Sequence, residues 1–233
     1  MNTLIKTTLG LALAASAATV SAADIAGNVT LATDYRFRGI SQIEGGVSPA
    51  IQGGFDYNHE SGFYLGTWAS NINFFGGSIE TDVYGGFRGQ FTEDVAYDIG
   101  FLYYGYPHAT TGAGNENVEI DYYEAYTSVS FSGFKFGVNY SPDYFAESGD
   151  FFYPYVDYSY AFGEAVTLSA HFGYNSFDEE TFLVTDDNYM DWKLALATTQ
   201  LGVTWTLAYV DTDLDDDEDC FGDEDLCAAT AVF

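Results

Sequence analysis

Ionisable side chains in this sequence recur at alternate positions of short segments that are otherwise rich in aromatic and aliphatic residues. Within 166–175, for example, Ser169 and His171 share one phase, and Leu168 and Phe172 share the other. Successive side chains of a β-strand point to opposite faces, so such a segment predicts one polar and one apolar face. The polar phase collects the candidate site residues: Asp34, Arg36, Arg38, Asp56, Glu80, Asp82, Arg88, Asp98, Glu124, Lys135, Asp157, His171, Asp191 and Lys193.

This polar phase offers charge and hydrogen bonding rather than covalent chemistry. Facing a lumen, it would either line a water-filled pore or fill the interior as a network of paired charges. The acids outnumber the bases, and Arg36, Arg38 and Arg88 are the expected partners of the inward acids. The same phase carries bulky rings that would narrow a lumen, at Tyr84, Tyr104, Tyr122 and Tyr126.

One group of residues has the types found in a hydrolase site. His171 is expected beside Asp157 and near Ser159 and Ser169, which would supply a base, an orienting acid and a nucleophile. The same group arises on any alternating polar face, and no nucleophile motif surrounds either serine. We therefore expect that the protein is not an enzyme and uses no cofactor.

The C-terminal tail has two further features. Cys220 and Cys227 are the only cysteines, and a close pair in an exported chain predicts a disulfide. The runs 211–219 and 223–225 are almost wholly acidic, and oxygen-rich clusters suit hard divalent cations. The EF-hand spacing is absent, so a solvated charge run is the first interpretation. The second is a weak surface metal site at Asp211, Asp213, Asp215 and Asp217.

The N-terminus predicts export. Residues 1–23 have the layout of a secretory signal peptide, with Lys6 near the start, an apolar stretch at 9–20 and small residues at 21–23. The domain that follows comprises residues 24–233. It keeps all 35 acidic residues but five of the six basic ones, since Lys6 is removed. Such an acidic chain is not expected to bind nucleic acid.

The elements that position the polar phase are twelve segments with period-two alternation, joined by links that are alternately long and short. An even number of strands with short turns at one end and long loops at the other is typical of an outer-membrane barrel. The sequence therefore predicts an all-β fold, an antiparallel up-and-down transmembrane β-barrel of about 12 strands. The predicted strands are 27–38, 48–58, 62–70, 78–90, 95–105, 118–131, 133–141, 152–162, 166–175, 189–198, 201–210 and 226–233.

The links also predict register. A short turn at 163–165 would pair Phe162 with Val166, Tyr160 with Leu168 and Asp157 with His171, so that each face keeps its character across both strands. The expected long links are 39–47, 71–77, 106–117, 142–151, 176–188 and 211–225, and the expected short ones are 59–61, 91–94, 132, 163–165 and 199–200.

Three stretches resemble a bacterial family. Asp34–Gln42 reads DYRFRGISQ, Ala50–Tyr57 reads AIQGGFDY, and Gly62–Asn71 reads GFYLGTWASN. They resemble the signature of the TorF-type porins, a proteobacterial family also known by a conserved domain of unknown function. The likeness extends over essentially the whole mature chain. It implies an outer-membrane β-barrel, and it brings no established substrate.

Together these features predict a porin of the outer membrane of a Gram-negative bacterium, a passive channel for small cationic or neutral solutes. The preference for cations follows from the acidic loops and the excess of inward acids. The alternative is a non-conducting surface barrel whose acidic loops bind divalent cations or a partner. The expected partners are outer-membrane lipid, small solutes and the barrel-assembly machinery, for which a terminal aromatic such as Phe233 is typical. The sequence does not indicate an oligomeric state.

Overall fold

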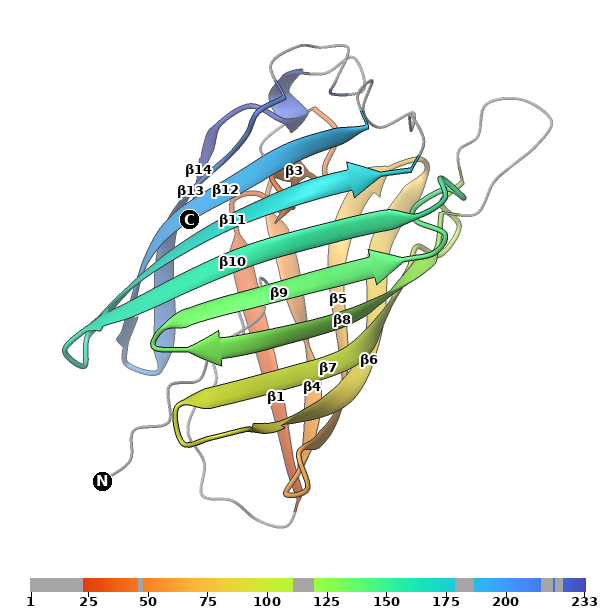
Figure 1. The fold of residues 1–233 in the computed structure, drawn as a ribbon. Coiled ribbons are helices and arrows are strands. Elements are labelled where there is room, and N and C mark those ends of the chain that lie inside the picture. Colours follow the sequence, from red (N-terminus) through yellow and green to blue (C-terminus); the bar gives the residue numbers. More distant parts are fainter. Residues whose placement is uncertain (1–22, 46–47, 111–119, 179–186, 215–219, 221–223) are drawn as a thin grey trace.

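The computed structural model describes residues 23–45, 48–110, 120–178, 187–214, 220 and 224–233 (Figure 1). The predicted signal peptide lies outside them except for its last residue, with which the first strand begins. The elements are β1 Ala23–Ala32, β2 Arg36–Phe37, β3 Ile40–Ser41, β4 Ala50–His59, β5 Phe63–Phe74, β6 Gly77–Gln90, β7 Val95–Gly105, β8 Tyr122–Phe131, β9 Phe134–Ser141, β10 Phe151–Phe162, β11 Val166–Phe177, β12 Asn188–Gln200, β13 Val203–Thr212, the 3-10 helix η1 Glu224–Leu226 and β14 Thr230–Val232.

Twelve of these strands form one antiparallel sheet that curves into a nearly closed barrel (Figure 1). Each strand pairs with the next along the chain, except that β1 pairs directly with β4 because β2 and β3 form a separate two-stranded sheet. The two edges approach each other where the Thr33 amide donates to the Phe233 carbonyl at 2.9 Å. The predicted all-β barrel of twelve strands is therefore confirmed.

Two strand predictions were wrong at the ends of the chain. The first strand was expected at 27–38, but β1 ends at Ala32 and the chain then leaves the barrel wall. Polar and apolar residues keep alternating through this segment, so periodicity alone could not show the departure. The last strand was expected at 226–233, but residues 224–226 form η1 and β14 comprises only Thr230–Val232.

The predicted hairpin at residues 163–165 is confirmed in register. Phe162 pairs with Val166, Tyr160 with Leu168, and Asp157 with His171. The long link expected at 71–77 is wrong, because β5 and β6 extend until Phe74 pairs with Gly77. Phe75 and Gly76 both have positive φ, the geometry of a two-residue hairpin turn. The short link expected at 199–200 lies two residues later, at 201–202.

The outer face of the barrel is apolar. Large hydrophobic side chains alternate outward along the strands and are exposed, among them Val29, Phe55, Phe101, Phe136 and Trp205. Their neighbours in sequence point inward, which places the polar phase in the interior. Among the described residues, no helix has the length and hydrophobicity to cross a membrane.

Inward-facing glycines make room for tyrosine rings. A Cβ at Gly66 would lie 2.3 Å from the ring of Tyr84, and one at Gly137 would lie 2.3 Å from the ring of Tyr155. Each tyrosine therefore lies flat across the backbone of a neighbouring strand, where any other residue would obstruct it. This arrangement places bulky polar rings inside a narrow barrel without distorting its wall.

Candidate functional site: the barrel interior

The segment 33–45, here called the inner hairpin, crosses the barrel interior. It contains β2 and β3, which pair Arg36 with Ser41. Its side chains and backbone bond to β6 and β8 on one side, and to β12 across the barrel from β6. Asp34, Arg36 and Arg38 were expected on a wall strand, and the structure instead places them on this hairpin. Arg38 and Gly39 both have positive φ, which turns the chain back on itself.

Arg38 anchors the inner hairpin to β8 in the barrel wall. Its Nη2 lies 2.8 Å from Oε1 and 2.9 Å from Oε2 of Glu124 on β8. Asn139 on β9 and Tyr104 on β7 also donate to Glu124 Oε2, at 2.7 and 3.2 Å. The guanidinium lies 4.2 Å from the ring centroid of Tyr153. The carboxylate of Glu124 is fully enclosed, so the ion pair is buried and richly hydrogen-bonded.

Arg36 ties the hairpin to the C-terminal tail. Its guanidinium pairs with Asp34 and donates to the backbone carbonyl of Leu226 at 2.7 Å. Ser41 donates to the other oxygen of Asp34 at 2.7 Å. The tail is closed at this point by the Cys220–Cys227 disulfide, which confirms the predicted pairing. Contact between the N-terminal segment and the disulfide loop had no signal in the sequence pattern.

Tyr35 joins the hairpin to β6. Its hydroxyl donates to Oε1 of Glu80 at 3.1 Å, and its ring packs edge-on against Trp68. Burial raises the pKa of the Tyr35 phenol well above its usual value, and the nearby Glu80 and Asp82 raise it further. The phenol therefore stays protonated and acts as a hydrogen-bond donor to Glu80.

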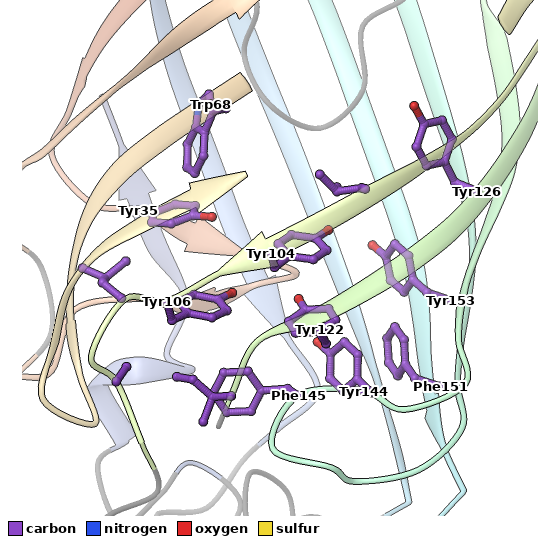
Figure 2. Packing of buried hydrophobic residues seen from close by; sticks show 14 of the residues in the cluster. Tyr35, Trp68, Tyr104, Tyr106, Tyr122, Tyr126, Tyr144, Phe145, Phe151 and Tyr153 are labelled. Atoms are coloured by element: carbon purple, nitrogen blue, oxygen red, sulfur yellow. The ribbon is translucent and has the colours of Figure 1, made fainter. Parts of the chain in front are cut away.

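Around the hairpin, aromatic side chains fill the interior next to the long loops. Figure 2 shows the rings of Tyr104, Tyr106, Tyr122 and Tyr144 gathered with Phe151. The centroids of Tyr104 and Tyr122 lie 4.4 Å apart, and those of Tyr144 and Phe151 lie 4.0 Å apart. We call this packed part of the interior, with the inner hairpin, the long-loop half.

The interior next to the short turns, here called the short-turn half, is polar and more open. Tyr64 donates to Asp98 at 2.5 Å and also bonds to Tyr126, while Tyr84 donates to Asp56 at 2.6 Å. Among the described residues, the bases Arg88 and Lys135 lie over tyrosine rings here rather than in ion pairs. Arg88 is exposed and lies 3.9 Å from the ring centroid of Tyr64, and the amine of the buried Lys135 lies 5.3 Å from that of Tyr155.

His171 lies between the two halves. Its Nδ1 is 2.6 Å from Asp157, and its Nε2 is 2.7 Å from the hydroxyl of Tyr153. The same hydroxyl contacts both oxygens of Asp191, which also accepts from Asn175 at 3.0 Å. Both ring nitrogens of His171 are thus engaged by acids or a phenol, and neither bonds to the serines considered above. Lys193 is the register partner of His171 on β12 and is partly buried.

The candidate metal-binding aspartates serve structural roles where they are described. Asp211 accepts from the hydroxyl of Tyr209 at 2.7 Å, and Asp213 accepts from the Met190 amide at 2.6 Å. Asp215 and Asp217 lie outside the described residues. Within the part of the chain that the structure describes, no group of three acidic, histidine or cysteine side chains is arranged to hold a metal ion.

Sequence reasoning found the ionisable members of the interior and some of their neutral partners. Tyr84 and Tyr104, which were expected on the polar phase, donate to Asp56 and Glu124. Tyr35 and Tyr153 were not among the expected interior residues, although each donates to an inward acid. Tyr153 occupies the inward phase of β10, so the period of the strand could have indicated it.

Comparison with known proteins identifies a family. No curated protein and no solved structure matched the chain. A family described as a bacterial protein of unknown function (Gcw_chp) matches residues 14–233. The match covers the whole barrel, the inner hairpin and the disulfide-closed tail. This β-barrel protein therefore belongs to the Gcw_chp family of bacterial proteins of unknown function.

Proposed function

We propose that the barrel spans the outer membrane of a Gram-negative bacterium, as the resemblance to TorF-type porins implies. The exposed apolar side chains on its outer face support this, because they would contact lipid. The charged residues of the strand centres point inward, and a basic side chain facing lipid would cost about 2–4 kcal/mol at the bilayer midplane. The long links would then face outward from the cell, and the short turns would face the periplasm.

Labelling of engineered cysteines tests this orientation. Asp143→Cys and Glu147→Cys lie in an exposed long link and should react with a membrane-impermeant maleimide on intact cells. Glu60→Cys and Glu164→Cys lie at exposed short turns and should react only after the outer membrane is opened. Labelling of Glu164→Cys on intact cells would reverse the assignment.

We further propose that the barrel is a passive channel for small cationic or neutral solutes, with the inner hairpin as its barrier. The observation that carries this proposal is the asymmetry of the interior. In the short-turn half, Arg88 is exposed and the Asp157 side chain is 24% exposed, although Lys135 is buried. In the long-loop half, the hairpin blocks the same axis. It is held there by hydrogen bonds, by the Arg38–Glu124 ion pair and by packing of Tyr35 and Phe37 on the rings of the wall, and its displacement is the proposed opening step.

Conductance across a planar lipid bilayer tests the channel. The variant replaces residues 36–41 with glycine and serine and carries Asp34→Asn and Glu124→Gln, which prevent buried unpaired carboxylates. The control carries Asp34→Asn and Glu124→Gln alone. We expect rare openings for the wild type, frequent openings for the hairpin variant, and a reversal potential in a KCl gradient that favours cations. Anion selectivity would contradict the proposed solute class.

The second candidate is a non-conducting surface barrel. The aromatic cluster favours it, since the rings around Tyr122 and Phe151 also pack against rings outside the hairpin. If the hairpin variant folds as a barrel and does not conduct, this second function replaces the first. Binding of Ca²⁺ or of a protein partner to the acidic loops would then be the activity to measure.

A further inference from the structure

Two carboxylic acids lie side by side beneath the inner hairpin without a base. Glu80 and Asp82 occupy successive inward positions of β6 and are 1% and 2% exposed. One oxygen of each, Glu80 Oε2 and Asp82 Oδ1, has no hydrogen-bond partner among the described residues. The other oxygen of Glu80 accepts from Tyr35. Buried polar atoms are nearly always satisfied, so these two oxygens call for a physical explanation.

The nearby bases do not neutralise this pair. None of the ion pairs among the described residues includes Glu80 or Asp82, and Arg38 is bound to Glu124. Glu124 provides the contrast, because a third buried acid of the same barrel has Arg38, Asn139 and Tyr104 around it. Two adjacent carboxylates cannot both remain ionised in a buried site unless a positive charge joins them.

The surroundings suit a cation of low charge. Asp82 is paired in register with Trp68 on one side and Tyr104 on the other, so aromatic rings flank it. Glu80 is paired with Ser70, which is also buried. The hydroxyl of Tyr35 adds a further oxygen above Glu80. A divalent ion would require more carboxylate ligands, and no third acidic side chain of the described chain is arranged to join these two.

We propose that Glu80 and Asp82 form a binding site for one small monovalent cation, such as Na⁺, under the inner hairpin. The cation takes the position between the two unpartnered oxygens, and Tyr35 couples the occupied site to the hairpin. The site lies on the axis of the proposed channel, but it requires only the folded barrel. Binding is therefore tested without conduction, and a failure of one proposal leaves the other standing.

The probe is Na⁺ added to the detergent-solubilised full-length mature protein at pH 8, with choline chloride at equal ionic strength as the reference. We expect NaCl to raise the midpoint of thermal unfolding by about 2–4 °C more than choline chloride, with saturation. The ²³Na resonance should broaden in the presence of the protein. The variant Glu80→Gln/Asp82→Asn should lose both responses. The control Asp143→Asn/Glu147→Gln removes two exposed loop acids and should keep both.

The outcomes separate binding from its alternatives. Equal effects of NaCl and choline chloride on the wild type would overturn the proposal, because the pair would then hold a proton or be screened nonspecifically. Loss of the response in the loop control would overturn it as well. If the double variant does not form a barrel, Glu80→Gln and Asp82→Asn are tested singly. A sodium response that is unchanged in both single variants counts against the site.

Discussion

The two halves of the barrel interior use the same residue types for different purposes. In the long-loop half, Arg38 is enclosed by Glu124 and the rings of Tyr153 and Phe151. In the short-turn half, Arg88 lies over Tyr64 and is exposed. The first arginine fixes a segment that crosses the lumen, and the second has an exposed side chain.

The difference shows what a polar interior does in a narrow barrel. Where a chain segment fills the lumen, charges become desolvated and need partners, as Arg38 and Glu124 do. Where no segment enters, a charge such as that of Arg88 can stay near water and then contributes little to stability. We therefore expect substitutions at the inner hairpin to change the free energy of unfolding more than other substitutions in the interior.

Replacing Arg38 should have the largest effect on stability. Arg38→Gln leaves Glu124 buried without its cation, and breaking a buried pair from one side costs about 3–5 kcal/mol. Urea unfolding of the barrel refolded into lipid vesicles measures the loss. Adding Glu124→Gln removes the unpaired charge and should recover much of it. A loss under about 1 kcal/mol for Arg38→Gln would mean that the Arg38–Glu124 pair is solvated. The long-loop half would then not differ from the short-turn half in its access to water.

The next largest loss of stability should come from overpacking in the short-turn half. Gly137→Ala places a methyl group against the ring of Tyr155, and overpacking of this kind costs about 1–3 kcal/mol. Tyr155→Ser removes the ring, so the alanine should then be nearly neutral. The double-mutant cycle measures that coupling. Additive effects would show that the ring moves aside and that this half is loosely packed.

The sequence predicted the wall of the barrel much better than its filling. Alternation and turn chemistry are local, so strand number, the residues 163–165 hairpin and its pairs followed from the pattern. The inner hairpin did not, because Asp34, Arg36 and Arg38 alternate as a strand would. Its position depends on Glu80 and Glu124, which are distant in sequence. The prediction of a long link at 71–77 was wrong for a local reason, since Phe75 adopts a positive φ that is uncommon for an aromatic residue.

Tyr153 connects the two halves, and its removal should have an intermediate effect. Its ring lies beside Arg38, while its hydroxyl bonds to His171 and Asp191. Tyr153→Phe keeps the ring and deletes the hydroxyl, leaving buried partners less well bonded at a cost of about 1–2 kcal/mol. His171→Gln is the matched change on the other side of that bond. If the double variant costs as much as the two single variants added together, Tyr153 does not transmit a coupling between the halves.

The smallest effect is expected for Arg88→Gln, the same substitution as at Arg38 in the opposite half. The guanidinium lies 3.9 Å from the ring centroid of Tyr64 and is exposed, so the change removes a cation–π contact. Such contacts contribute about 0.5–1 kcal/mol at exposed sites. No acid depends on this arginine within 4.0 Å among the described residues, so no buried charge is stranded. Urea unfolding under the conditions used for Arg38→Gln gives the comparison directly. If Arg88→Gln destabilises the barrel as strongly as Arg38→Gln, the short-turn half excludes water as the long-loop half does. The channel proposal would then lose its support, because it depends on an interior that is accessible to solvent at the short turns.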